Sequence, residues 1–426
     1  MSPSTAPKGR NLATPLKLPC GYTLPCRVMK AALAETLADE SGLPGKELLT
    51  LYRAWDTMAI PMLTGHVIVA RNGIENVRNV CIEGSTDDEI RTAFKAWSSS
   101  TSQPLFMQLN HCGRQVSRLI NKAPVAPSPV AMTNPLLRMM HSNPTGITVE
   151  QIHEITEGFA RAAKLAVESG LAGVQIHAAH GYLLSQFLSQ RSNQRQDSFG
   201  GCIENRARML YEVVSRVRAA VGPKVPVFVK LNTADFIKGG LTLEESISIG
   251  KRLELLGVDL LEMSGGTYEN PALLAESTRA RQSFFVELAE QMVAAVDQMP
   301  IMVTGGLRCA ADIEDALSRG ISVVGIGRPA CVCPHLVRRI MDGDQSVVLD
   351  YSVQIPFMFR HLRRIIETFF PLALPGFEVL FYQNQMLRLA NERNPERRVT
   401  VLGLLALVIF RLVVSFHTLM KLKPWE

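Results

Sequence analysis

The segment VQIHAAHGYLLSQFLSQRSNQRQDSFGG, residues 174–201, places three proton-handling side chains within six residues. They are His177, His180 and Tyr182, and they follow an apolar run of the kind that forms a buried strand. Imidazoles can exchange protons or donate hydrogen bonds near neutral pH, whereas a phenol, whose ordinary pKa is about 10, stays protonated. The spacing predicts a site at the end of a strand where protons are held or transferred.

The chain around this segment alternates short apolar runs with stretches of helical periodicity. Eight strand-then-helix units within about 315 residues favour a closed (β/α)8 TIM barrel over an open sheet. Thr148, with Gln151 three residues later, predicts an N-terminal capping box for one of the helices. Strands are expected at 27–33, 61–69, 105–111, 173–179, 225–232, 259–266, 301–307 and 322–329, and helices at 45–57, 86–97, 149–169, 203–221, 242–256, 283–298, 310–319 and 334–341.

Side chains at the C-terminal ends of barrel strands face the catalytic mouth. Polar residues occupy these positions here: Gln108, His111, His177, His180, Lys230, Asn232 and Ser264. The last two strands end in Gly305-Gly306 and in Gly327-Arg328. Glycine amides and an arginine can hold an anion, and this fold often binds phosphate after its seventh and eighth strands. The sequence therefore predicts a phosphate site at this edge of the barrel.

Six motifs, in order within residues 18–341, resemble the Old Yellow Enzyme family of NADH:flavin oxidoreductases, which are FMN-dependent ene-reductases on a (β/α)8 barrel. The most specific lies at 177–209, where H-x-x-H-G-Y-L is followed by N-x-R-x-D-x-F-G-G-x-x-E-N-R. The other five are QLNHCGRQ (108–115), VKLNTADF (229–236), MSGGTYE (263–269), TGGLR (304–308) and GIGRP (325–329).

This resemblance implies a bound FMN whose phosphate is held by Gly305, Gly306, Gly327 and Arg328. No metal is expected, because the H-x-x-H spacing offers half of a metal site and no third ligand stands out.

The resemblance also implies contacts to the flavin ring. Gln108 would bond the pyrimidine edge, and Lys230 would stand near N1 and O2, where a cation favours the anionic reduced ring. Ala32 and Ala34 would line the flavin, with Ala34 standing where the family often has Thr or Cys.

The reaction that the resemblance implies is ping-pong. NADH or NADPH reduces FMN and leaves, and an α,β-unsaturated carbonyl compound then takes the hydride at its β-carbon. His177 and His180 would bind the carbonyl oxygen, where negative charge collects. Tyr182 would protonate the α-carbon. Tyr268 and its loop would shape the substrate pocket.

Two other interpretations of the barrel stay open. Lys230 is suited to Schiff-base chemistry, as in barrel aldolases, because a desolvated lysine can attack a carbonyl. The chain could instead be a catalytically silent flavin-binding protein tethered to a membrane. His66 and His111 are interpreted as structural, and Arg195 and Asp197 as an ion pair that orders a loop.

Composition limits the partners. The chain is 47% hydrophobic and 20% charged, with a net charge of +6 and scattered basic residues, so no nucleic-acid partner is expected. Eight cysteines form no C-x-x-C pair and are interpreted as buried thiols in a reducing compartment. The first residues lack the apolar core of a secretory signal, so a cytoplasmic-facing, non-secreted protein is expected. A homo-oligomer is left open.

The expected organisation is an N-terminal arm (1–17), the barrel (18–342), which begins with a small hairpin at 18–26, a helical extension (343–398) and a hydrophobic tail (399–426). Residues 399–420 are almost wholly apolar and would measure about 33 Å as a helix, enough to cross a bilayer core. Arg411, close to the centre, opposes insertion. Membrane association is favoured over packing on the barrel, with spanning and interfacial modes both open.

Overall fold

The computed structural model describes residues 12–267, 269, 278–351 and 373–396. Within these ranges eight parallel strands close into a barrel in the order β10-β11-β12-β3-β4-β5-β8-β9, which confirms the predicted (β/α)8 fold. Each strand lies inside its predicted run: β3 (Val28–Lys30), β4 (Met62–Ile68), β5 (Leu105–Asn110), β8 (Gly173–Ala178), β9 (Val227–Asn232), β10 (Leu260–Ser264), β11 (Ile301–Thr304) and β12 (Val323–Ile326).

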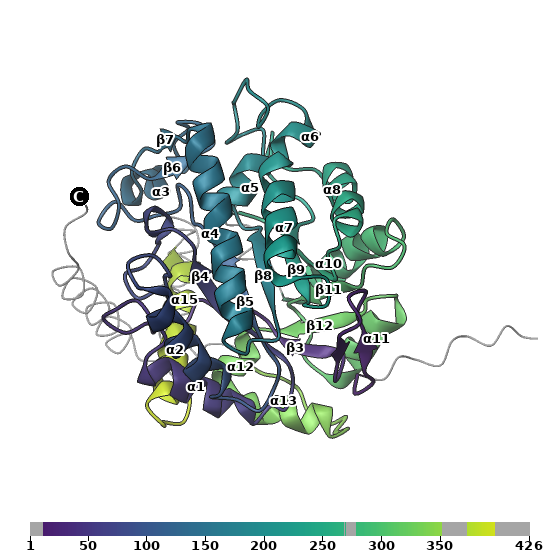
Figure 1. Ribbon diagram of the computed structural model, residues 1–426. Helices are drawn as coiled ribbons and strands as arrows, with labels where there is room; N and C mark the ends of the chain where they lie inside the picture. The colour runs from purple at the N-terminus through teal and green to yellow at the C-terminus, as the bar shows by residue number, and fades with distance from the viewer. Residues whose placement is uncertain (1–11, 268, 270–277, 352–372, 397–426) are drawn as a thin grey trace, which may run out of the picture.

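Helices surround the barrel (Figure 1) and follow the strands along the chain as expected. The predicted helix 203–221 is divided at Ala207 into α6 (Ile203–Arg206) and α7, and α10 begins five residues before its expected start at 283. The principal outer helices are α1 (Lys46–Asp56), α2 (Asp87–Ser98), α4 (Val149–Glu168), α7 (Arg208–Val221), α8 (Leu243–Leu255), α10 (Thr278–Val293), α11 (Ala310–Ser318) and α13 (Pro334–Met341).

An apolar plug fills the N-terminal end of the barrel interior. A hairpin of β1 (Leu16–Lys17) and β2 (Thr23–Leu24) closes this end, starting two residues before the predicted 18–26. Because side chains alternate along a strand, the residue two positions beyond each plug residue of a strand also points inward. In four of these strands, β5, β9, β10 and β11, that residue is polar. The plug residues are Leu18, Leu24, Met29, Leu63, Phe106, Phe228, Leu260, Met302 and Val323, all buried.

Long loops gather at the opposite end, at the top of Figure 1. The loop after β5 contains β6 (Val125–Ala126), α3 (Pro135–Met140) and β7 (Thr145–Gly146), and the loop after β8 contains α5 (Leu183–Leu188) and α6. Arg195 pairs with Asp197 at 2.5 Å and donates from Nη1 to the Pro127 carbonyl at 3.0 Å. The pair joins the two loops, which confirms its predicted loop-ordering role.

Helix α4 begins with the predicted capping box. Thr148 Oγ1 accepts from the Gln151 backbone N–H at 3.2 Å, and Gln151 Oε1 accepts from the Thr148 N–H at 3.0 Å. Loss of such a cap typically costs about 1 kcal/mol, so Thr148→Ala should lower the free energy of unfolding by about 1 kcal/mol in urea titrations. Thr92→Ala, on the exposed face of α2, is the control and should cost less. Equal stability of Thr148→Ala and the unmodified chain would contradict the assignment.

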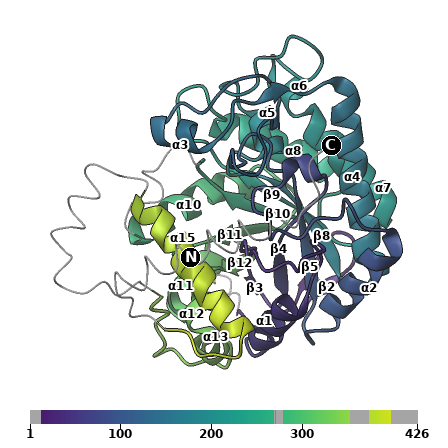
Figure 2. The same cartoon turned by 90° about the vertical axis from the view of Figure 1, so that its left-hand side faces the viewer.

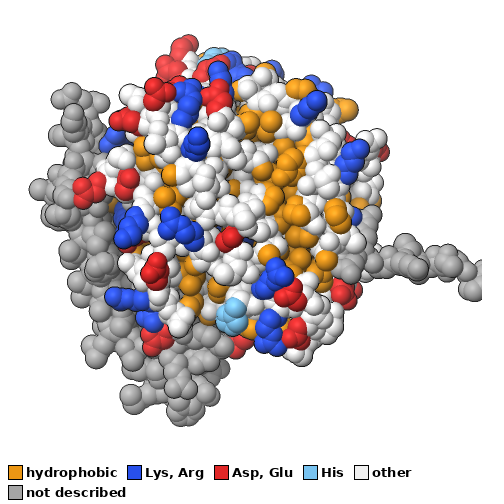
Figure 3. Space-filling model, turned by 60° about the horizontal axis from the view of Figure 1, so that its bottom comes forward, with side chains coloured by type: hydrophobic (Ala, Val, Ile, Leu, Met, Phe, Trp, Pro, Cys, Tyr) orange, Lys and Arg blue, Asp and Glu red, His pale blue; other side chains and the backbone are white. Residues whose placement is uncertain are grey.

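The described part of the extension contains α15 (Ala373–Ala390), which packs on α1 and on α12 (Arg328–Val332) (Figure 2). Tyr382 Oη donates to the Tyr351 carbonyl at 3.0 Å, tying α15 to the chain that leaves the barrel. The tail at 399–420 lies outside the described residues. Among the described helices, none combines the length and apolar character that crossing a bilayer requires. On the face in Figure 3, the coloured area mixes basic, acidic and apolar side chains.

Candidate active site

A chain of buried polar side chains crosses the barrel interior just above the apolar plug. Gln108 Nε2 donates to Gln175 Oε1 at 2.7 Å, and Gln175 Nε2 donates to Glu262 Oε2 at 2.7 Å. The other carboxylate oxygen, Oε1, accepts from Thr304 Oγ1 at 2.7 Å and pairs with Lys230 Nζ at 2.9 Å. Five adjacent strands, β5, β8, β9, β10 and β11, supply these residues, so Gln108 and Lys230 are held on a rigid floor.

Glu262 is completely buried, and a buried carboxylate is costly unless it is paired and hydrogen-bonded. Both of its oxygens have partners, and one partner is the Lys230 ammonium. An ammonium paired in this way lacks the free electron pair that attack on a carbonyl needs. The arrangement therefore favours Lys230 as a fixed positive charge over the Schiff-base alternative.

His177 lies near the end of β8, 3% exposed, beside Lys230 in the register of β8 and β9. Its Nδ1 accepts from the Ala179 backbone N–H at 3.2 Å. In a neutral imidazole one nitrogen accepts and the other carries the proton, so the Nε2–H of His177 remains as a donor.

His180 is held in an unusual backbone conformation, with φ +59°. Its backbone N–H donates to Asn232 Oδ1 at 3.2 Å, and its Nε2 lies 2.6 Å from Ser264 Oγ. Left-handed backbone at a non-glycine residue is maintained only where surrounding contacts fix it. Asn232 and Ser264, from the ends of β9 and β10, supply those contacts and turn the imidazole next to that of His177, with ring centroids 5.1 Å apart.

Tyr182 precedes α5 and is 4% exposed. Its ring lies edge-on to His177, with centroids 5.0 Å apart, and edge-on to His66 at 5.5 Å. Its hydroxyl donates to Glu75 Oε2 at 2.9 Å. The structure thus brings the three residues of the opening segment together, and adds His66 and Glu75, neither of which the sequence singled out for chemistry.

Both active-site histidines are neutral near pH 7. Burial lowers the pKa of His177 well below its ordinary value, with smaller contributions from His180, Lys230 and His66. Burial likewise lowers the pKa of His180 to about 3, and Lys230 and His66 act in the same direction. Two neutral imidazoles, rather than imidazolium ions, are therefore available to bind an oxygen atom.

His111, which the sequence analysis interpreted as structural, is a third buried histidine, and its low pKa can be tested through the pH dependence of stability. It is completely buried against Asn72, with its Nε2 2.8 Å from Asn72 Oδ1, and burial lowers its pKa to about 3. The unfolded chain protonates this group below about pH 6.5, whereas the folded chain stays neutral down to about pH 3. Stability is therefore complete above about pH 6.5 and falls as the pH falls toward 3.

His111→Gln should shrink the difference in unfolding free energy between pH 7.5 and pH 5.5 by about 1.4 kcal/mol, the share of one such histidine. Urea titrations at the two pH values measure it. His335→Gln, on the exposed surface of α13, is the control. A pH difference that is the same in His111→Gln as in the unmodified chain would show that His111 does not stay neutral on folding.

The predicted phosphate site has open space above its glycines. Gly305 has φ +112° and Gly306 has φ +83°, so both adopt backbone that favours glycine. A Cβ on Gly305 would meet no atom within 4 Å, and one on Gly327 would come no closer than 3.8 Å, to Leu33. The ends of β11 and β12 therefore leave room for a ligand against the main chain.

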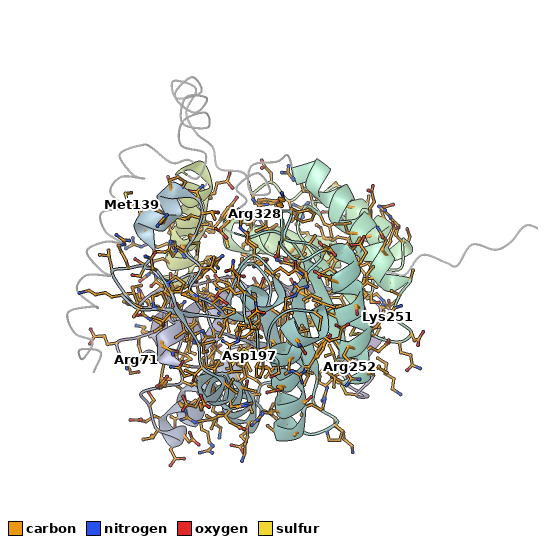
Figure 4. All side chains as sticks on the ribbon, turned by 90° about the horizontal axis from the view of Figure 1, so that it is seen from above. Arg71, Met139, Asp197, Lys251, Arg252 and Arg328 are labelled. Atoms are coloured by element: carbon orange, nitrogen blue, oxygen red, sulfur yellow. The ribbon has the colours of Figure 1, made fainter. Side chains whose placement is uncertain are left out.

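Arg328 stands at this edge, close to α15 (Figure 4). Its guanidinium carbon lies 5.0 Å from the ring centroid of Tyr351 and 5.9 Å from that of Tyr382, and its Nη1 lies 3.6 Å from Glu378 Oε2. The Arg308 guanidinium lies over the same Tyr351 ring at 5.2 Å. The extension thus orients Arg328, the predicted phosphate-binding arginine. Arg308 adds a second positive charge, to which the sequence assigned no role.

These residues fit an FMN. Glycine backbone and arginine at the ends of β11 and β12 suit the phosphate, and the Gln108 amide and Lys230 ammonium suit the polar edge of the ring. Ala32 and Ala34 follow β3 and are partly buried, small side chains that leave room beside a flat ligand. Tyr268 lies outside the described residues.

A buried ion pair closes one side of the mouth. Arg114, after β5, donates from Nη2 to Glu269 Oε2 at 2.8 Å, and both side chains are under a tenth exposed. The other oxygen of Glu269 accepts from the Thr133 N–H at 2.7 Å. These contacts join the loop after β5 to the loop after β10. The sequence analysis predicted no role for Arg114 or Glu269.

Comparison with known proteins decides the family. The model of the NADH:flavin oxidoreductase / NADH oxidase family matches residues 12–346. The chain belongs to this family. The resemblance to Old Yellow Enzyme inferred from the motifs is confirmed.

Relatives of this flavin oxidoreductase span most of its length. It is 32% identical to the NADH-dependent flavin oxidoreductase iliE of Hypocrea jecorina (strain QM6a) over 384 residues, which cover 82% of this chain and 94% of that protein. It is 33% identical to the NADH-dependent flavin oxidoreductase iccE of Talaromyces variabilis, covering 78% and 86%. It is also 32% identical to the NADH oxidase of Thermoanaerobacter brockii, covering 76% of this chain but 49% of that longer protein.

Solved structures agree on the fold of this flavin oxidoreductase. A 2-naphthoyl-CoA reductase superposes with a TM-score of 0.73 at 25% identity, covering 83% of this chain and 56% of that one. Morphinone reductase superposes with a TM-score of 0.66 at 24% identity, covering 81% and 92%. The family, together with the fit of the site, makes the chain an oxidoreductase that uses FMN and a nicotinamide reductant.

Proposed function

We propose that this flavin oxidoreductase reduces the C=C bond of α,β-unsaturated carbonyl compounds. The observation that carries the proposal is the convergence of two neutral imidazoles and a phenol at the mouth of the barrel. The ring of His177 lies 5.1 Å from that of His180 and 5.0 Å from that of Tyr182. An enone needs this set of groups: hydrogen-bond donors for its oxygen and an acid for its α-carbon.

The two histidines act on the carbonyl oxygen. The Nε2–H of His177 is a donor, since its Nδ1 is already an acceptor. His180 donates from Nδ1 when the Ser264 hydroxyl donates to its Nε2, 2.6 Å away. Negative charge develops on the oxygen as the hydride arrives, and preorganised donors in a dry site stabilise it more than water does. Together they polarise the alkene toward hydride addition.

Tyr182 supplies the proton. Its ring is packed between His177 and His66, so the hydroxyl is held close to the carbonyl-binding histidines. A phenol is protonated at neutral pH and can give its proton to the α-carbon as the enolate forms. FMN held by Gln108, Lys230, Gly305, Gly306, Gly327 and Arg328 would supply the hydride-transfer chemistry, and Tyr182 supplies the proton that completes the reduction.

Lys230 provides the positive charge within the buried polar side chains that form the floor of the site. The Glu262 carboxylate fixes its position at 2.9 Å, and Gln175 and Thr304 fix the carboxylate. A positive charge held rigidly at this place would favour electron acceptance by a flavin bound beside it, because no reorganisation is needed when charge arrives. We infer that substrate and nicotinamide use this one mouth in turn, as a ping-pong sequence requires.

Anaerobic reoxidation tests the proposal. Holoenzyme reduced with one equivalent of NADH should regain its oxidised flavin spectrum when cyclohex-2-enone is added, and cyclohexanone should form in equal amount. A phenol, which resembles the enolate, should bind the oxidised enzyme and give a charge-transfer band that weakens in His177→Ala. A protein that carries FMN but is reoxidised by no enone would support the catalytically silent alternative.

A further inference from the structure

The hydroxyl of Tyr182 already has a partner that the proposed reaction does not use. It donates to Glu75 Oε2 at 2.9 Å, and the other oxygen of Glu75 lies 3.1 Å from His66 Nε2. Glu75 lies in the loop after β4, whereas His66 is on β4 and Tyr182 follows β8. Three separate parts of the chain thus form one continuous line of hydrogen-bonding groups, His66–Glu75–Tyr182.

This line leads from a buried acid toward solvent. Tyr182 is 4% exposed, whereas the Glu75 side chain is 18% exposed. A phenol that gives its proton to a substrate becomes a phenolate and must regain a proton before the next turnover. The exposure difference makes Glu75 the member of this line that water reaches more readily.

We propose that Glu75 returns the proton to Tyr182 after each turnover and that His66 positions Glu75 for this step; the inference rests on the proposed alkene reduction. The Tyr182 O–H bond breaks as the C–H bond forms at the α-carbon. Water then protonates Glu75, and that proton passes from Oε2 to the phenolate oxygen. The cycle consumes one solvent proton and changes no oxidation state beyond the hydride transfer itself.

Charge repulsion between Tyr182 and Glu75 favours the return of the proton when Tyr182 has lost its own. A phenolate 2.9 Å from a carboxylate places two like charges together, which favours protonation of the carboxylate at the moment when the proton is needed. Cys112 and His141 also lie within electrostatic reach of Glu75. Burial raises the pKa of Cys112 well above its ordinary value and lowers that of His141. Both are therefore neutral near pH 7, and neither adds a charge beside Glu75.

The contacts at this cluster are those of a hydrogen-bonded network. His66, Glu75 and Cys112 offer nitrogen, oxygen and sulfur atoms within 4.8 Å of one another. Each has a partner within the protein: His66 Nε2 lies 3.1 Å from Glu75 Oε1, Tyr182 donates to Glu75 Oε2, and Asn110 Nδ2 donates to Cys112 Sγ at 3.4 Å. Hydrogen bonding accounts for the geometry of this cluster, in which Glu75 carries the proton, His66 positions Glu75 and Cys112 has no role in the transfer.

The test compares one turnover with many in the FMN-loaded Glu75→Gln variant. Glutamine is the same size and can still accept from Tyr182, but it cannot carry a proton. The first turnover of NADH-reduced enzyme with cyclohex-2-enone should keep its rate. Later turnovers should slow by about 10-fold or more, because a transfer step by one positioned group is lost. Tyrosinate absorbance should persist after the first turnover, because the phenolate has not regained its proton.

Two variants complete the experiment. Glu83→Gln, in the same loop but bound to the Arg71 backbone, should behave as the unmodified enzyme. Glu75→Asp keeps a carboxylate and should recover part of the multiple-turnover rate. An unchanged multiple-turnover rate in Glu75→Gln, or an equal slowing of its first turnover, would overturn the inference. If the unmodified enzyme reduces no enone, the proposed function fails instead, so the two failures are distinguishable.

Discussion

Replacement of Tyr182 by phenylalanine is expected to slow alkene reduction by about 10²–10⁴-fold, the usual contribution of one positioned acid. Reduction of FMN by NADH should be nearly unchanged, because that half of the cycle needs no proton from Tyr182. Stopped-flow absorbance of the flavin measures the two half-reactions separately. The phenylalanine ring keeps the packing against His177 and His66, so the change removes the hydroxyl and little else.

The loss of the hydroxyl also frees Glu75, which accepts from it. Tyr211→Phe, on the outer helix α7, removes a phenol remote from the mouth and is the matched control. If enone reoxidises Tyr182→Phe as fast as the unmodified enzyme, another group protonates the α-carbon. If both half-reactions slow together, Tyr182 supports the site as a whole and the assigned role is wrong.

Replacement of Lys230 by methionine should destabilise the fold by about 3–5 kcal/mol, because it strands a buried carboxylate. Glu262 has no exposed surface and relies on the ammonium at 2.9 Å for its charge balance. Methionine has nearly the same length as lysine, so packing is largely kept. Urea titration in saturating FMN measures the change in the free energy of unfolding. The affinity for FMN should also fall if the Lys230 ammonium faces the flavin.

The double variant Lys230→Met/Glu262→Gln separates charge from packing. With both charges removed, much of the lost stability should return, since glutamine can still bond Gln175 and Thr304. A double variant as unstable as Lys230→Met alone would show that the cost lies in packing and that the ion pair contributes little.

Much of the fold could be predicted because its signals are local. Buried parallel strands are continuous apolar runs, and all eight were found from them. The cap at Thr148 was found because a capping box has a fixed spacing of three residues. Helix α10 was placed five residues late, since its first residues lack the periodicity that marks an amphipathic helix.

The site was predicted less completely, and the reason is geometric. His177, His180 and Tyr182 lie close along the chain, so their meeting needed no knowledge of the barrel. Gln175 lies two positions before His177 and Glu262 two positions before Ser264, so inward alternation along β8 and β10 could have revealed them.

Glu75 could not be found in this way. It lies in an irregular loop with no period, and its contact with Tyr182 spans 107 residues of sequence. The same limit applies to Arg114 and Glu269, whose loops meet only when the barrel closes.

Isotope labelling of the product tests the central claim most directly. Anaerobic reduction of cyclohex-2-enone with NADH deuterated at both C4 positions in H2O should place one deuterium on the β-carbon. Unlabelled NADH in D2O should place one deuterium on the α-carbon, beyond the exchange of a product-only control. This outcome requires hydride from the flavin and a proton from an exchangeable group such as Tyr182. Absence of the saturated product, or deuterium from NADH on the α-carbon, would contradict the account.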